Sequence, residues 1–324
     1  MAVVENPAEK PARTSGASAR RDPISSISMR FEIVSIFPGF FASIFEHGIL
    51  RRALAEGLIE VGLHDLREFT HDRHRTVDDR PFGGGEGMVL KPEPLAEALA
   101  ALGIAPKPDF RQCQGTTSVV PQMQQNMEGA LAADRSHQRV ILLSAQGRPF
   151  TQAVARELAE LDRIVLICAR YEGVDERINQ LYCDLELSIG DYVLSGGELA
   201  AAVVVDAVMR LVPGVLGNEA SGEFESFGVA DAEIAADAEG VPRSQHGSGG
   251  LLDYPHYTRP AEFAGVRTPE VLLNGDHQQI RRWRREQQLR KTLANRPDLL
   301  ERASLSDEDR RVLDAIRQEA EPQS

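Results

Sequence analysis

The sequence predicts an α/β protein in which helices cover a largely parallel sheet. Short apolar runs of strand length, such as "RVILLSAQG" and "RIVLICARYEG", alternate with segments whose apolar residues recur at helical spacing, such as "TQAVARELAEL". This alternation is typical of parallel strands that are joined by crossover helices. Beyond residue 253 the patterns are helical, so we expect a second, small all-α domain.

The expected elements follow one another along the chain. Four runs rich in apolar residues predict strands, at residues 30–36, 58–66, 139–147 and 163–173. Four segments of helical periodicity predict helices, at residues 39–57, 91–102, 151–161 and 197–211. Prolines in the first turn favour the second helix, and Thr151 is placed to cap the third. Two more helices are expected, at residues 268–293 and 306–320.

Three polar segments without periodicity separate these elements. Residues 1–28 are rich in Pro, Ala, Ser and charge, which predicts a disordered extension without an export signal. Residues 103–137 are rich in Gln and read as an inserted surface loop. Residues 218–252 are acidic and then rich in Gly and Ser, as in a flexible interdomain linker. The predicted domains are therefore residues 29–217 and 253–324.

Composition limits the class of protein. The 324 residues are 42% hydrophobic and 26% charged, which is ordinary for a soluble globular protein. The longest apolar run, residues 199–205, is too short to span a bilayer. The three cysteines, Cys113, Cys168 and Cys183, have no disulfide or metal spacing, as expected of a cytoplasmic protein. The net charge of −13 argues against a nucleic-acid partner, but the 13 basic and 13 acidic residues from 253 to 324 balance, so that part could present a basic face.

Two motifs are typical of RNA contact. In "FTHDRHRTVDDRPFGGGEGM", residues 69–88, arginines and histidines alternate with aspartates before a glycine-rich turn. Arginine binds phosphates and base edges, aspartate accepts from guanine, and glycines allow close backbone approach. A metal site of His71, Asp72 and His74, or a solvated loop, would use the same residues. The helix "IRRWRREQQLRK" carries six basic residues and one glutamate, which suits either RNA or a plain solvated face.

A second pair of motifs follows buried segments, where ligands of open α/β sheets bind. These are "ARYEGVDER" and "LSIGDYVLSGGE". The latter lacks the lysine of a phosphate-binding loop and carries Asp191 and Glu198, which would repel a phosphate. A neutral or cationic ligand without phosphate suits it, and S-adenosylmethionine has this character. The alternative is an ordinary strand-to-helix turn.

Together these segments resemble the bacterial tRNA (guanine-N1)-methyltransferases of the SPOUT superfamily, from residue 29 to about residue 315. "IVSIFPGFF", "REFTHDRHRTVDDRPFGGGEGMV", "RYEGVDERI", "SIGDYVLSGGELA", "PGVLGNEAS", "LLDYPHYTRP" and "LLNGDHQQIRRWR" occur in the order of that family. The resemblance implies a SPOUT-type parallel sheet whose C-terminal part forms a trefoil knot, with knot loops that hold S-adenosylmethionine. The implied cofactor-binding residues are Leu142, Leu143, Ser144, Ala145, Ala169, Tyr171, Glu172, Gly173, Ser188, Ile189, Gly190, Asp191, Tyr192, Val193, Leu194, Gly196 and Gly197.

The resemblance also implies the reaction and its partners. The substrate is tRNA with guanosines at positions 36 and 37, and N1 of guanosine 37 is methylated. Glu225 matches the general base and Arg210 the donor to guanine O6. The implied substrate-binding residues are Asp78, Gly83, Gly87, Arg170, Arg281 and Arg282. A homodimer with composite active sites is implied, as is a need for Mg²⁺, although no residues can be chosen as its ligands.

The sequence departs from the family at several positions. Glu225 stands where the family usually has aspartate, and a shift in register would leave Glu223 or Asp231 as the base instead. Ala145 replaces a usual proline and Ala169 a usual glycine, and the insertions at 103–137 and about 228–248 are not typical. Two alternatives therefore stay open: a tRNA-binding protein without catalysis, or a SPOUT methyltransferase on another RNA. The segments "HYTRP" and "IRRWR" argue against the second.

Overall fold

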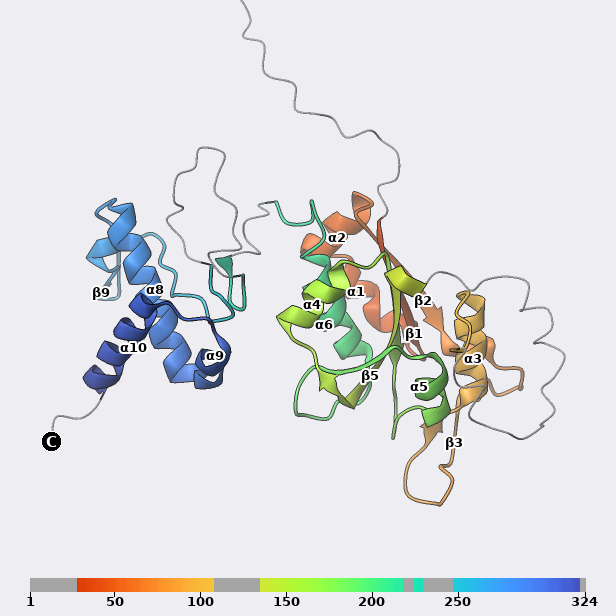
Figure 1. Cartoon of the computed structure of the whole chain (residues 1–324). Coiled ribbons are helices and arrows are strands. Elements are labelled where there is room, and N and C mark those ends of the chain that lie inside the picture. Colours follow the sequence, from red (N-terminus) through yellow and green to blue (C-terminus); the bar gives the residue numbers. More distant parts are fainter. Residues whose placement is uncertain (1–27, 108–134, 218–223, 230–246, 321–324) are drawn as a thin grey trace, which may run out of the picture.

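A five-stranded parallel sheet forms the centre of the N-terminal part. The computed structural model describes residues 28–107, 135–217, 224–229 and 247–320 (Figure 1). The sheet has the order β2-β1-β6-β5-β7, and all of its pairs are parallel. Its strands are β1 (Met29–Ser35), β2 (Ile59–Asp65), β5 (Gln138–Pro149), β6 (Arg163–Cys168) and β7 (Leu185–Ser188). The predicted parallel α/β architecture is confirmed.

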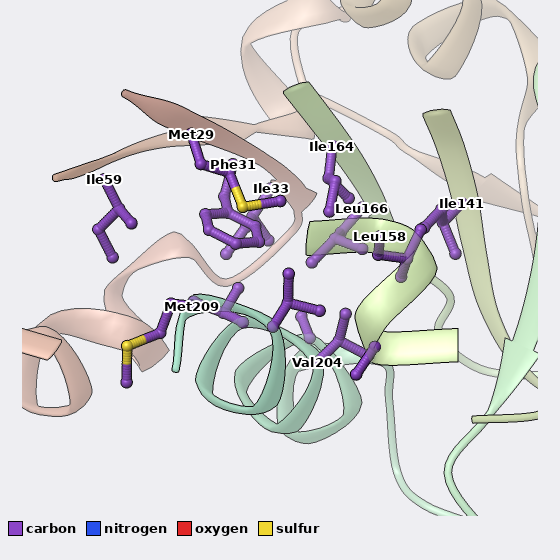
Figure 2. Close-up of a cluster of buried hydrophobic side chains, with 14 of the residues drawn as sticks. Met29, Phe31, Ile33, Ile59, Ile141, Leu158, Ile164, Leu166, Val204 and Met209 are labelled. Carbon is purple, nitrogen blue, oxygen red and sulfur yellow. The ribbon is translucent and has the colours of Figure 1, made fainter. Parts of the chain in front are cut away.

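Helices cover both faces of this sheet. Because side chains alternate along a strand, Phe31 and Ile33 of β1 point to one face, where α2 (Gly48–Ala55), α4 (Gln152–Ala159) and α6 (Glu198–Met209) pack. Figure 2 shows Phe31, Ile33 and Leu166 beside Val204 and Met209 of α6. Val34 points to the other face, which α3 (Pro92–Ala101) and α5 (Glu176–Tyr182) cover. Two apolar clusters therefore fix the sheet between the helices.

Several elements differ from the prediction. The helix expected at 39–57 is broken into a 3-10 turn (Pro38–Phe41), α1 (Ala42–Phe45) and α2, because His47 is extended and Gly48 has a φ of +60°. The helix expected at 268–293 begins with a 3-10 turn (Glu270–Leu272) and starts properly at α8 (His277–Asn295). Asp276 caps α8 by accepting from the backbone amides of Gln278 and Gln279. Strand β7 and helix α5 were not predicted.

Parts of the two predicted insertions lie outside the described residues, namely 108–134 and 230–246. At the described start of the first insertion, Ile104 is buried in the cluster on the α3 face. Residues 224–229 belong to the predicted linker and include Glu225. The domain boundaries at 217 and 252 remain predictions.

The C-terminal part is built on α8, α9 (Pro297–Arg302) and α10 (Asp307–Ala320), which pack around Leu251, Leu289 and Leu313. A bidentate pair from Arg285 to Asp309, at 2.7 and 3.0 Å, ties α10 to α8. Burial raises the pKa of Asp309, but hydrogen bonds and charge from Arg285 outweigh it, so the pKa lies below its usual value. A short hairpin, β8 (Glu262–Phe263) with β9 (Val266–Arg267), means that this part is not purely helical.

In the part of the chain that the structure describes, every helix is too short or too polar to cross a membrane.

Candidate active site at the carboxyl ends of the strands

A pocket of about 300 Å³ lies where β5, β6 and β7 end. Three segments line it, together with Ala200 of α6: residues 143–146 within β5, residues 169–173 after β6, and residues 187–197 without Asp191 at the end of β7 and beyond. Its position agrees with the rule that ligands of parallel sheets bind outside the carboxyl ends of the strands. Its size is at the lower end of the range for small-molecule sites.

The pocket collects most of the residues that the resemblance assigns to the cofactor. Of that set, Leu142 and Asp191 alone do not line it. Leu142 points into the core cluster on the α3 face, because neighbouring positions of β5 face opposite sides of the sheet. Asp191 is exposed. Gln146 and Ser195, which lie inside the segments that the resemblance assigns to the pocket, also line it, whereas Leu187 and Ala200 line it and were not predicted.

Close backbone contacts hold the three loops together. The amide of Gly197 donates to the carbonyl of Ala169 at 2.8 Å, and a Cβ on Gly197 would lie 2.7 Å from Cα of Cys168. Similarly, a Cβ on Gly147 would lie 2.5 Å from the backbone of Glu186. A side chain at Gly197 would push two loops apart, and one at Gly147 would push β5 away from β7. These two glycines are therefore required by the close approach of neighbouring backbone segments.

A partly buried ion pair neutralises the arginine of the pocket, which Glu172 also lines. Arg170 is the basic side chain among the described residues that line it. Its guanidinium lies 2.8 Å from Oε2 of Glu198, which is 1% exposed, and 4.6 Å from the ring centroid of Phe37. The hydroxyl of Ser35 donates to Glu198 Oε1 at 2.6 Å. Because Glu198 neutralises Arg170, the pocket offers no strong attraction to a phosphate, and it fits a cationic ligand such as S-adenosylmethionine.

The same ion pair also joins two of the segments that line the pocket. Arg170 Nη1 donates to the carbonyl of Ser195 at 3.0 Å, so the guanidinium joins the second loop to the third. Burial and the charge of Glu198 raise the pKa of the adjacent Cys168 thiol well above its usual value, which keeps this thiol neutral. Arg170, predicted to bind substrate, thus has its guanidinium engaged within the protein, and its contact with tRNA remains a prediction.

We expect Glu198→Gln to weaken S-adenosylmethionine binding by about tenfold, because an uncompensated buried arginine would shift the loops it joins. The dissociation constant would be measured by titration calorimetry, and the melting temperature should fall as well. Glu157→Gln is the matched control, since Glu157 pairs with Arg148 at 3.3 Å with a side chain that is 65% exposed. An unchanged cofactor affinity for Glu198→Gln would show that the pair does not position the loops.

The glycine-rich segment of the arginine–aspartate motif contacts the pocket. Asp78 lies in β3 (Asp78–Asp79), which pairs with β4 (Val89–Leu90) to close a loop that Figure 1 shows extending away from the sheet. The amide of Glu172 donates to the carbonyl of Met88 at 3.0 Å, and a Cβ on Gly87 would lie 2.4 Å from Oε1 of Glu172. The structure therefore brings Gly87 beside the predicted cofactor pocket. Gly83 lies nearer the loop tip, with φ +85°.

The metal site considered from the sequence does not form among the described residues, which contain no group of three or more potential ligands. His71 instead lies 2.8 Å from Glu97. Asp72 accepts from the hydroxyl and the amide of Thr76 and from the amide of His74. The hydrogen bonds from Thr76 lower the pKa of Asp72. His71, Asp72 and His74 thus serve local structure.

Arg210 and Glu225, the predicted catalytic residues, form an ion pair with each other. The turn that carries Glu225 is held by two hydrogen bonds at Phe227, whose amide donates to Leu251 and whose carbonyl accepts from Arg156, both at 2.8 Å. Neither Arg210 nor Glu225 lines the pocket. Helix α6 has 12 residues and starts at the pocket, so the Arg210 backbone lies about 18 Å further along its axis. Within one chain, Arg210 and Glu225 therefore lie away from the pocket.

Arg281 and Arg282 lie on α8, in the C-terminal part. Arg282 is exposed and Arg281 is partly buried. Two other basic residues of this helix, Arg285 and Arg290, are paired with carboxylates. The exposed charge of α8 is therefore smaller than its sequence suggests.

A parallel sheet with a glycine-lined pocket at its strand ends places the chain among the α/β proteins that bind a small ligand at the sheet edge. Comparison with known proteins identifies which. The family model described as tRNA (Guanine-1)-methyltransferase TrmD matches residues 29–123 and 107–302, and the chain belongs to this family.

The chain matches its curated relatives over nearly the whole of their length. A protein of Koribacter versatilis (strain Ellin345) is 53% identical over 289 residues, which are 89% of this chain and 98% of that protein. A protein of Syntrophotalea carbinolica is 46% identical over 90% of this chain and 98% of its own. One of Dehalococcoides mccartyi (strain ATCC BAA-2266) is 44% identical over 91% and 99%. All three are named tRNA (guanine-N(1)-)-methyltransferase.

Proposed function

We propose that the protein transfers a methyl group from S-adenosylmethionine to N1 of guanosine 37 of tRNA, in the cytoplasm. The observation that carries the proposal is the pocket: three chain segments with four glycines meet beside the ends of β6 and β7, and the arginine among the described lining residues is neutralised by Glu198. The family match supports the reaction class and the tRNA substrate.

The chemistry needs a base and a donor. N1 of guanine carries a proton and is a poor nucleophile until that proton leaves. S-adenosylmethionine, when bound, supplies an electrophilic methyl group on a sulfonium. The Glu225 carboxylate would accept the N1 proton, and the Arg210 guanidinium would donate to O6, where negative charge develops. The ion pair places the two groups side by side, as a base at N1 and a donor at the neighbouring O6 of one guanine would require.

The distance along α6 supports a homodimer with composite sites. Arg210 and Glu225 lie too far from their own pocket to act there, so a partner protomer would have to supply them. Helix α6 also presents Leu199 and Val203, 48% and 44% exposed, and the adjacent 3-10 segment presents Phe37 and Phe40, 47% and 39% exposed. Such an apolar surface is typical of a protein–protein interface. We propose that it pairs with its copy about a two-fold axis.

A trefoil knot in the second half of the sheet domain is also part of the proposal. Gly147 of β5 lies against Glu186 of β7, and Gly197 lies against Cys168 at the end of β6, so closely that neither position admits a side chain. These close passages support threading of the third loop through the others, as the resemblance implies. Such threading would hold the pocket segments in place whether or not a ligand is bound.

The RNA would contact two regions of the chain. Asp78 and the glycines of the loop beside it, including Gly83 and Gly87, would read guanosine 36 near the reacting base. Arg281 and Arg282 would contact phosphates of the anticodon arm. The target base must leave the stack, which costs a few kcal/mol. A need for Mg²⁺ remains part of the proposal, without assigned ligands.

A substrate panel tests the function. Labelled S-adenosylmethionine would be offered with a tRNA transcript carrying guanosine at 36 and 37, with the adenosine-37 and cytidine-36 variants, and with ribosomal RNA fragments. We expect methyl transfer to the first transcript, loss with adenosine 37 and a strong decrease with cytidine 36. Transfer to ribosomal RNA instead would favour the other-RNA alternative, and intact tRNA binding without transfer would favour the binding-only protein.

A further inference from the structure

The C-terminal part contains a hollow of about 430 Å³ that the reaction does not use. Its walls include Tyr254, Tyr257 and Trp283, with Ile280 beside them. Trp283 is the single tryptophan of the chain. Tyr254 is 4% exposed and Tyr257 is 47% exposed, so one ring lies deep and the other stands at the rim.

The rings are held apart and oriented. The ring centroids of Tyr257 and Trp283 are 6.2 Å apart at an interplanar angle of 58°, so they do not stack face to face. Tyr254 is fixed from two sides, by the guanidinium of Arg284 at 4.8 Å from its centroid and by the ring of His256 at 4.8 Å. His256 is itself held by Asp253 at 2.9 Å. These contacts position the deep ring while leaving Tyr257 and Trp283 accessible to a ligand face.

The charge of the hollow is opposite to that of the whole chain. Arg259 and Arg284 line it, and none of the described residues lining it is aspartate or glutamate. The chain as a whole carries a net charge of −13. A hollow that combines aromatic walls with basic side chains and excludes acid suits a flat, apolar ring attached to an anion.

We propose that this hollow binds a single unstacked nucleobase of the tRNA, with the adjoining phosphate at Arg259. The proposal rests on the tRNA substrate proposed above and adds a second nucleotide site to it. Base–aromatic stacking tolerates any base, so the site would contribute affinity and hold the anticodon arm rather than read sequence. A carboxylate of a partner peptide or of a second copy of this chain would also be attracted to Arg259, but a carboxylate side chain offers no flat ring to stack on the aromatic walls.

The fluorescence of Trp283 reports on the site directly, because no other tryptophan contributes. Titration of the full chain with the guanosine-37 transcript should quench it, with the same midpoint as binding measured by filter retention. Tyr257→Ala should weaken tRNA binding about tenfold, whereas Tyr257→Phe should bind as wild type does, because it keeps the stacking face. Affinity for S-adenosylmethionine should stay unchanged in both variants. Phe263→Ser is the matched control, since Phe263 is a 76% exposed aromatic residue outside the hollow.

Replacing the nucleotides of the transcript one at a time by abasic residues should restore the fluorescence at one position. Full-affinity tRNA binding by Tyr257→Ala, with Trp283 unquenched and methyl transfer intact, would overturn the nucleobase site and leave the proposed function standing. If Trp283 were quenched in the absence of RNA as the protein concentration rises, the hollow would bind a second copy of the chain. That result would also overturn the nucleobase site. A wild-type protein that binds no tRNA would overturn both proposals.

Discussion

Replacing Glu225 with glutamine is expected to lower the rate of methyl transfer by about 10²- to 10⁴-fold, the range for loss of a general base. The amide keeps the size of the side chain but cannot accept the N1 proton. Affinities for S-adenosylmethionine and tRNA should change little, because the loss concerns the transition state. Single-turnover kinetics with labelled S-adenosylmethionine and the guanosine-37 transcript measures the chemical step.

Three variants decide whether the base is assigned correctly. Glu225→Asp shortens the arm to that of the usual family residue and should retain activity within about 100-fold, the cost of a displacement near 1 Å. Glu223→Gln and Asp231→Asn, the carboxylates that a shifted register would use, should transfer methyl at the wild-type rate. Wild-type transfer by Glu225→Gln together with collapse in one of these two would move the base to that residue.

Hybrid dimers are expected to recover activity that neither parent shows. One parent is Glu225→Gln and the other is Leu194→Arg, which places a positive charge among the pocket residues and repels a cationic cofactor. In a mixed dimer, the intact pocket of one protomer meets the intact Glu225 of the other, whereas the second site carries both changes. With random assembly of equal amounts, half of the dimers are mixed and each has one intact site, so activity should reach about a quarter of wild type.

The measurement is methyl transfer by the two chains expressed together, compared with each chain alone. The melting temperatures of both parents serve as the check on folding. The physical reason is the length of α6, since Arg210 lies about 18 Å along the helix from the pocket at its start. If a single chain supplied pocket and base together, the mixture would be as inactive as the parents.

Local pattern accounts for much of the fold. The strands β1 and β6 and the first half of β5 are apolar runs that the sheet buries, whereas β2 at the edge of the sheet alternates and buries only Ile59. The Thr151 cap is seen at α4, where it accepts from the amide of Val154. Strand β7 escaped prediction because its four residues, "LELS", are short and include a glutamate. The break at Gly48 escaped because the apolar spacing continues across it while the backbone does not.

The site depends on contacts that no local pattern contains. The resemblance assigned three segments to one cofactor site, and in the structure most of those residues line one pocket. Ser35 and Glu198 are 163 positions apart, yet their hydrogen bond helps to hold the arginine of the pocket. The separation of Arg210 from that pocket follows from the length of α6 and from the fact that α6 begins at the pocket. Sequence periodicity predicts the helix itself but not its position relative to the strands.

The most direct test of the proposed function is the identity of the methylated nucleoside. The guanosine-37 transcript would be incubated with the protein and labelled S-adenosylmethionine, digested to nucleosides and resolved by liquid chromatography with mass spectrometry. We predict that the label is found in 1-methylguanosine alone and disappears when position 37 is adenosine. Label in another methylated nucleoside, or in 1-methylguanosine that persists without guanosine 37, would contradict the account.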